Sequence, residues 1–153
     1  DGTQESVLAV FDYLTEKLGL EAFRALFPVI LTDNGVEFKD PDQLEHAPNN
    51  CPRTKIFYCD PQASWQKPHV EKNHVLLRRI LPKGTSFKDL TKAQVALATS
   101  HINSVVRELF DNQTPFDLFV GENEKKLLEL LDLSPIAPDE VYLKPALLKT
   151  KPN

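Results

Sequence analysis

Two short apolar runs limit what this chain can fold into. Val29-Ile30-Leu31 is continuous and rich in β-branched residues, which is typical of a strand that is buried on both faces. Ile56-Phe57-Tyr58-Cys59 is a second run of this kind, and Asp60-Pro61 ends it. Helical patterns flank both runs, so the order of elements predicts an α/β architecture. Because two strands do not complete a sheet, we expect an N-terminal part of the sheet to lie outside this sequence.

Five helices are expected around these strands. Apolar spacing predicts an amphipathic helix over 5–18, capped by Gly19, and a second piece over 20–27 that Pro28 stops. Three more helices follow: one from Pro68 with Val70, His74, Leu77 and Leu81 inward, one over 92–109 with Val95, Ala98, Ile102, Val105, Val106 and Leu109 inward, and one over 122–132. The stretches 39–55 and 133–153 are expected to be irregular.

Charge is unevenly distributed along the 153 residues. Hydrophobic residues make up 41% and charged residues 26%, and no apolar run approaches the roughly 18 residues that a membrane span requires. The formal net charge is −4, yet residues 53–92 hold nine basic and three acidic residues. Such a segment is either a solvated face or a contact surface for a polyanion. The pI of about 5.6 argues against a dedicated DNA-binding domain.

Cysteine usage excludes a disulfide scaffold. The two cysteines, Cys51 and Cys59, are too few, and their seven-residue gap does not suit a zinc knuckle. We therefore expect two reduced thiols. The chain begins with Asp1 and contains no methionine, so we also expect that it is not a complete translation product.

Asp33 is the first candidate for chemistry, because it directly follows the first apolar run. Ligands of open α/β sheets gather beyond the carboxyl ends of the strands, and a carboxylate there can bind Mg²⁺. The alternative is a purely structural one. Asn34-Gly35 between apolar runs is a strong hairpin signal, and Asp33 would then stabilise a turn.

Glu71 is the second candidate, in the first turns of the helix that begins at Pro68. The alternative is an ordinary surface glutamate favoured by a helix N-terminus. Basic residues surround it in the sequence: Arg53, Lys55, Lys67, Lys72, Arg78, Arg79 and Lys83. Carboxylates among cations are what metal-assisted phosphoryl transfer on a polyanion requires.

Together these motifs resemble the catalytic core of bacterial insertion-sequence transposases, which are relatives of retroviral integrase. The resemblance covers about residues 5–120 and rests on Thr32-Asp33-Asn34-Gly35-x-Glu37-Phe38, Trp65-Gln66-Lys67, Val70-Glu71-Lys72-Asn73, Arg78-Arg79-x-Leu81-Pro82-Lys83-Gly84-Thr85 and Thr114-Pro115, where x is any residue. It implies an α/β fold of the ribonuclease-H-like type that is incomplete here, without its first three strands and first catalytic Asp. Residues 1–120 would be the C-terminal part of the core, and 121–153 a C-terminal helix and irregular tail.

The resemblance also implies a chemistry. Asp33 and Glu71 would be the second and third carboxylates of a DDE triad and would bind a pair of Mg²⁺ ions. The residues expected to contact DNA are Lys67, Lys72, Arg78, Arg79 and Lys83. The parent protein would hydrolyse a phosphodiester at a transposon end and join the 3′ hydroxyl to target DNA, in the bacterial cytoplasm and nucleoid. This chain alone would be inactive. Two departures from the family pattern are Pro68, where relatives commonly have Gly, and Ser104-Val105-Val106, which replaces a polar Asn/Arg/Pro stretch.

Two rival functions remain open at this point. One is a structure-selective nuclease of the same fold, and the other is a non-catalytic interaction module in which Asp33 and Glu71 point apart. The transposase interpretation requires strands 29–32 and 56–59 to be parallel and the two carboxylates to converge. It also predicts a homo-oligomer, because one strand edge is open. The alternative is a rearranged, mostly helical packing in which the helix over 92–109 covers this edge. The residues expected in the core are Val7, Phe11, Leu14, Ile30, Ile102 and Val106.

Overall fold

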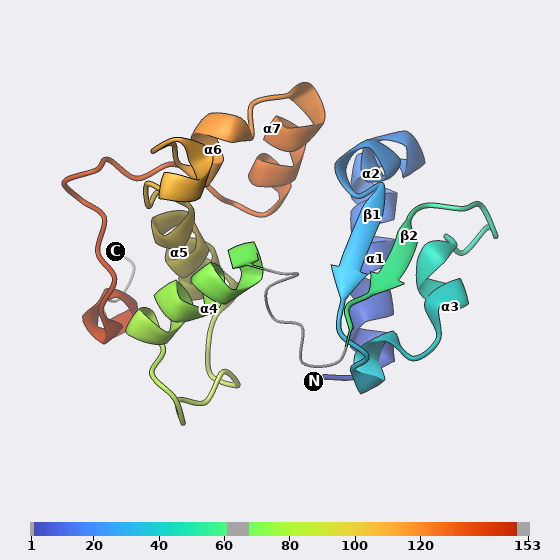
Figure 1. The fold of residues 1–153 in the computed structure, drawn as a ribbon, viewed down its shortest axis with the longest axis horizontal. Coiled ribbons are helices and arrows are strands. Elements are labelled where there is room, and N and C mark those ends of the chain that lie inside the picture. Colours follow the sequence, from blue (N-terminus) through green and yellow to red (C-terminus); the bar gives the residue numbers. More distant parts are fainter. Residues whose placement is uncertain (1, 61–67, 150–153) are drawn as a thin grey trace. The chain divides into compact units, whose positions relative to one another are not determined.

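The chain forms two compact units, Asp1–Lys67 and Pro68–Asn153 (Figure 1). The computed structural model describes residues 2–60 and 68–149, with the side chains of Pro68 and His69 excepted. Each unit has buried hydrophobic residues of its own. None of the helices in these two ranges combines the length and the apolar character needed to cross a membrane.

Unit 1 alternates helices with two strands. Its elements are α1 (Gln4–Leu18), α2 (Leu20–Leu26), β1 (Val29–Thr32), the 3-10 turn η1 (Val36–Phe38), α3 (Pro41–Glu45) and β2 (Lys55–Tyr58). The first two predicted helices and both predicted strands are confirmed to within one residue at each end. Gly19 joins α1 to α2 at a φ of +86°, which glycine adopts at little cost. The short helix α3 lies in the stretch that was expected to be irregular.

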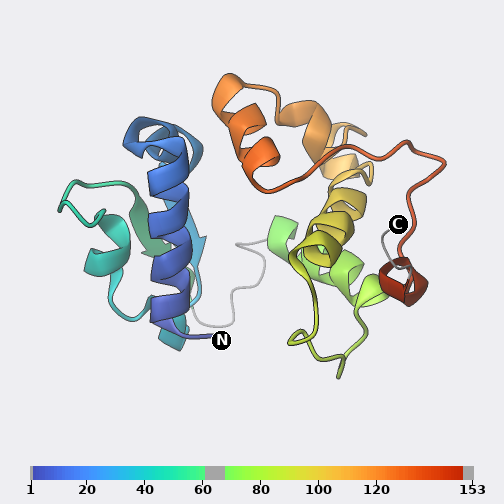
Figure 2. The ribbon, with the colours of Figure 1, turned by 180° about the vertical axis from the view of Figure 1, so that it is seen from behind.

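The strands β1 and β2 are parallel neighbours, as the transposase interpretation requires. Val29 pairs with Lys55 and Thr32 with Tyr58. Just beyond the last pair, the N–H of Cys59 donates to the carbonyl of Thr32 at 2.8 Å. The two arrows therefore point the same way in Figure 1, and the view from behind in Figure 2 shows α1 covering them. The C-terminal ends of both strands meet at one edge of this small sheet.

The two faces of the sheet differ in burial. Thr32 and Ile56 are 6% and 8% exposed, whereas Val29, Leu31 and Phe57 on the other face are 56%, 45% and 55% exposed. The prediction that residues 29–31 are buried on both faces is therefore wrong for unit 1. The physical reason is that the helices of this unit cover only one side of the sheet.

A buried arginine ties the helices of unit 1 together. Arg53, two residues before the start of β2, is 1% exposed. Its Nη1 donates to Oδ1 of Asp12 at 2.6 Å, and its Nε donates to the carbonyl of Leu44 at 2.8 Å. The rings of Phe11 and Phe23 lie 5.4 and 5.7 Å from the guanidinium carbon. Side chains from α1 and α2 and the backbone of α3 thus meet at one cation.

Unit 2 is helical in its described part. Its elements are α4 (Pro68–Ile80), α5 (Lys92–Asn103), the 3-10 turn η3 (Glu108–Phe110), α6 (Pro115–Leu118), α7 (Glu122–Leu130) and η4 (Pro145–Lys149). Its core cluster joins α4, α5 and η4 and consists of Leu76, Ile80, Leu81, Ala98, Ile102 and Leu147. The start of α4 at Pro68 and the helix over 122–132 are confirmed, the latter ending two residues early.

The buried stripe of α4 differs from the prediction. Leu76 and Ile80 are 2% and 1% exposed, whereas Val70 is 41% exposed and His74 is also exposed. Leu81 is buried and Leu77 is half-buried, as expected. The buried stripe is therefore rotated around the helix axis relative to the predicted one, and does not lie on the opposite face. The rotation follows from packing, because α5 and η4 both pack against the Leu76 and Ile80 side.

Helix α5 is shorter than predicted. It ends at Asn103 instead of residue 109, and Val106 and Leu109 are 52% and 65% exposed. The chain turns here because residues 107–113 form a closed loop, in which the N–H of Arg107 donates to the carbonyl of Gln113 at 3.0 Å. The inward placement of Val95, which is 50% exposed, was also wrong.

The expected core residues have mixed outcomes. Leu14 and Ile102 are buried, Val7, Phe11 and Ile30 are half-buried, and Val106 is exposed. The exposure of Val106 follows from the early end of α5.

The segment after α7 is held against α5 by polar side chains. Ser100 and Ser104 accept hydrogen bonds from the backbone N–H groups of Ser134 and Ile136, at 3.2 and 2.8 Å. Nδ1 of the buried His101 accepts from the N–H of Tyr142 at 3.1 Å. Residues 134–142 are therefore irregular in backbone conformation but anchored to the helix. The predicted boundary at residue 120 stays a prediction.

Candidate functional site

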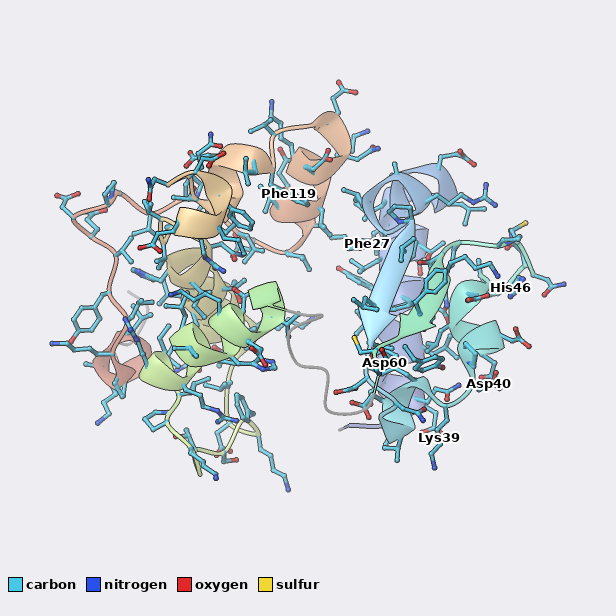
Figure 3. All side chains as sticks on the ribbon, viewed as in Figure 1. Phe27, Lys39, Asp40, His46, Asp60 and Phe119 are labelled. Carbon is cyan, nitrogen blue, oxygen red and sulfur yellow. The ribbon has the colours of Figure 1, made fainter. Side chains whose placement is uncertain are left out.

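Asp33 lies at the carboxyl edge of the parallel strand pair. It directly follows β1, is exposed, and stands next to the Cys59–Thr32 hydrogen bond that ends the ladder. Asp60 follows β2 at the same edge, and Figure 3 shows it beside the strand tips, while Phe27 lies at the opposite end. Two carboxylates thus leave the sheet where ligands of α/β proteins gather.

The hairpin alternative for Asn34-Gly35 is wrong. After Asp33 the chain enters η1 and returns only through α3, so that β2 runs parallel to β1. Gly35 has a φ of −66°, a conformation open to any residue. The Glu37 side chain folds back over Gly35, since a Cβ placed there would lie 2.6 Å from its Oε2.

Glu71 lies in the first turn of α4 and is exposed. The partial positive charge of a helix N-terminus favours a carboxylate there. Arg78 follows at i+7 and therefore shares its side of the helix, while Lys72 and Arg79 form the neighbouring row. All four side chains are exposed.

The predicted DNA-contacting residues in α4 and shortly after it are accessible. Lys72, Arg78, Arg79 and Lys83 are exposed, and none of them forms an ion pair with a carboxylate among the described residues. The guanidinium of Arg78 lies over the ring of Phe87 at 5.9 Å from its centroid, which orients it without neutralising it. Lys67, the fifth predicted contact, lies outside the described residues.

Arg53 and Lys55 both form ion pairs within unit 1. Arg53 is buried against Asp12, and Nζ of Lys55 donates to Oε2 of Glu45 at 2.7 Å. Both residues lie in unit 1, whereas Glu71 lies in unit 2. The prediction that Arg53 lies among the cations that surround Glu71 is wrong, because its side chain is buried. For Lys55, whose side chain is exposed, it stays a prediction.

Asp33 and Glu71 belong to different units, so their convergence stays a prediction. Among the described residues there is no group of three His, Cys, Asp or Glu side chains that could hold a metal ion. Unit 1 and unit 2 each offer exposed carboxylate oxygens, which are the donors that Mg²⁺ prefers, but neither has a full ligand set.

Glu45 is a carboxylate with a structural role in unit 1. Its Oε1 accepts a hydrogen bond from the N–H of Ile56 at 2.9 Å, and its Oε2 accepts from Lys55. The backbone N–H of Ile56, followed by the ammonium of Lys55, lowers the pKa of Glu45 below its ordinary value. The side chains of Asp33 and Glu71 are exposed.

The cysteines behave as expected. Cys51 and Cys59 are free thiols. His101 is 6% exposed, and burial lowers its pKa. Sequence reasoning missed one further polar contact, from Arg107 to Asn73, which no pattern in the sequence announces because the two residues are 34 positions apart.

Transposases of bacterial insertion sequences are the class of protein that this chain resembles, and comparison with known proteins confirms that resemblance. The chain is 27% identical over 100 residues to the transposase for insertion sequence element IS4351 of Bacteroides fragilis, which covers 65% of this chain and 29% of the relative. It is 30% identical over 64 residues to the transposase InsI for IS30A of Escherichia coli K12 (42% of this chain, 17% of the relative). It is 25% identical over 118 residues to the transposase for IS1086 of Cupriavidus metallidurans (77% and 32%).

These alignments cover at most about a third of the length of the relatives. No family model matches the chain, and no solved structure matches it.

Proposed function

We propose that this chain is the C-terminal part of a transposase catalytic core of the ribonuclease-H-like type, in which Asp33 and Glu71 serve the same site. The observation that carries the proposal is the parallel pair β1–β2 with Asp33 at its carboxyl edge. The cation-lined face of α4 around Glu71 and the similarity to insertion-sequence transposases support it.

The proposed cofactor is Mg²⁺, in a two-metal site that Asp33 and Glu71 share with a carboxylate outside this chain. Such ions stabilise the attacking and leaving oxygens of an in-line phosphoryl transfer. Exposed carboxylates suit a hard cation, but two of them leave much of its charge unbalanced. The chain by itself should therefore bind Mg²⁺ weakly and should not cleave DNA.

The basic side chains of α4 hold the substrate in this proposal. Lys72, Arg78 and Arg79 would contact phosphates along the DNA backbone, which fixes its register without reading its sequence. In the first reaction, water attacks a phosphorus at the transposon end, and the bond to the 3′ oxygen breaks. In the second, the freed 3′ hydroxyl attacks a target phosphodiester, and a target 3′ oxygen leaves.

Cleavage of transposon-end DNA by the full-length parent protein tests the catalytic assignment. Asp33→Asn and Glu71→Gln should each lower cleavage at least about a hundredfold, because each removes a charged metal ligand. Glu129→Gln on α7 is a matched control and should retain activity. Cleavage without strand transfer would favour the nuclease alternative, and full activity in both site variants would favour the non-catalytic module.

Salt-dependent binding of duplex DNA tests the basic face in this chain itself. The double variant Lys72→Glu, Arg79→Glu should weaken binding. It should also reduce the slope of log affinity against log salt by the amount that about two phosphate contacts contribute. Lys125→Glu with Lys126→Glu makes the same charge change on α7 and should have the smaller effect. Equal losses in both pairs would show that only net charge matters.

A further inference from the structure

The first turns of α4 carry Glu71 but have little apolar anchoring. Every residue from Val70 to Val75 is exposed, and burial begins only at Leu76. A helix end without packed side chains opens locally at low cost. A carboxylate on such an end is not held in a fixed geometry unless another contact holds the helix.

One polar contact reaches this stretch from another part of unit 2. Asn73 lies three residues before Leu76 and seven before Ile80, on the same side of α4. Its Oδ1 accepts a hydrogen bond of 2.8 Å from Nη2 of Arg107. Within the described residues it is the one side-chain hydrogen bond that joins residues 70–75 to another element.

Arg107 is itself held firmly. It is 5% exposed and is the first residue of the loop 107–113, which its backbone hydrogen bonds close. Its N–H donates to the carbonyl of Gln113 at 3.0 Å, and its carbonyl accepts from the N–H of Asn112 at 3.1 Å. Nη2 also donates to the carbonyl of Ile102 at 3.3 Å. These hydrogen bonds therefore hold the Arg107 guanidinium in a fixed position next to Asn73 of α4.

A contribution to stability does not explain why the Arg107 guanidinium is buried. Burial lowers the pKa of the Arg107 guanidinium, and its Nε is buried without a hydrogen-bond partner. No carboxylate among the described residues lies within ion-pair distance of it. A buried cation without a carboxylate is destabilising, and local arrangements of this kind are more typical of functional sites than of cores.

We propose that Arg107 is a positioning residue for Glu71 and acts through Asn73, an inference that rests on the proposed function of Glu71. The hydrogen bond fixes the helix two residues after Glu71. It thereby limits opening of the turn that carries the carboxylate, and small displacements of a catalytic group cost large factors in rate. Arg107 takes no part in bond making or breaking.

Amide hydrogen exchange tests the contact in this chain. Asn73→Ala removes the acceptor, and His74→Ala is the matched control, because asparagine and histidine gain similar helix propensity on replacement by alanine. Exchange of residues 71–75 should accelerate about tenfold in Asn73→Ala and stay within about twofold in His74→Ala. Asn73→Asp keeps the acceptor and should restore protection. Equal exchange in the two alanine variants would overturn the proposal.

Cleavage kinetics of the full-length parent protein test the positioning role. Asn73→Ala should lower kcat for transposon-end cleavage about tenfold with KM for DNA unchanged, and Asn73→Asp should recover it. An unchanged kcat in Asn73→Ala, together with lost cleavage in Glu71→Gln, would overturn the positioning role while leaving the proposed function in place. Retained cleavage in Glu71→Gln would overturn both.

Discussion

The guanidinium of Arg53 and the carboxylate of Asp12 form an ion pair of 2.6 Å in which the Arg53 side chain is fully buried and the Asp12 side chain is 36% exposed. The two residues are 41 positions apart, so this contact brings the segment before β2 against α1. Because β2 sets the position of Asp60 and pairs with the strand that carries Asp33, the geometry of the candidate site depends on this buried pair.

Breaking the pair should destabilise unit 1 strongly. Asp12→Ala leaves the Arg53 cation buried without its counter-charge, which typically costs about 3 kcal/mol. The additional change Arg53→Met should recover part of the loss, because it removes the stranded charge and keeps most of the volume. Urea unfolding followed by circular dichroism measures both. The exposed pair Lys17–Glu16 provides the control, and Lys17→Met should leave the midpoint unchanged.

Unit 1 should lose stability in acid because of Glu45. Its folded pKa lies below the ordinary 4.5, so the unfolded chain binds the proton more readily. The stabilisation is complete above about pH 4.5 and is lost as the pH falls through the lowered folded pKa. Thermal unfolding between pH 6 and 3 should show this slope, and Glu45→Gln should reduce it. An identical pH dependence in Glu45→Gln would contradict the assignment.

Unit 2 should respond to pH in a higher range because of His101. Burial lowers its pKa from 6.5 against a smaller opposing effect of Glu140. The unfolded chain therefore binds more protons, and stability falls as the pH drops below about 6.5 until the lowered folded pKa is reached. Protonation also turns Nδ1 into a donor that repels the N–H of Tyr142. The protection factors of residues 134–142, which divide out the intrinsic pH dependence of amide exchange, should fall from pH 7.5 to 5.5, but not in His101→Gln.

Parts of the fold could be predicted because the local sequence determines them. The continuous runs at 29–31 and 56–59 predicted two strands, and the structure has both. Their parallel pairing was expected from the transposase interpretation and is confirmed. The stripe of α4 could not be assigned from spacing, because Leu76-Leu77 and Ile80-Leu81 are adjacent pairs that fit two rotations of the helix. Only packing against α5 decides between them.

Part of the candidate site could likewise be predicted from the sequence, and part could not. Asp33 could be located because it follows an apolar strand, and Glu71 because it follows a helix-starting proline. The Arg107–Asn73 contact and the burial of Arg53 could not, since each depends on partners 34 to 41 positions away. A charge count treats a buried arginine and an exposed one alike.

The exposed sheet face of unit 1 should support self-association. Val29, Leu31 and Phe57 form an apolar face, and β1 has no partner strand on its second edge within the described residues. Such a strand edge tends to pair with another chain. Sedimentation at micromolar concentration should show a species larger than a monomer, and Leu31→Glu should shift it toward the monomer. A compact monomer at all concentrations would rule out the expected homo-oligomer.

Thiol cross-linking tests whether Asp33 and Glu71 converge. In a Cys51→Ser, Cys59→Ser background, Asp33→Cys and Glu71→Cys place one thiol at each position, and a short bifunctional maleimide reports their proximity. Ligands of one two-metal site surround ions roughly 3.5–4 Å apart, so the account predicts efficient intramolecular cross-linking. The matched pair Asp33→Cys with Glu129→Cys should not react. Cross-linking of the site pair no better than of this control would contradict the account.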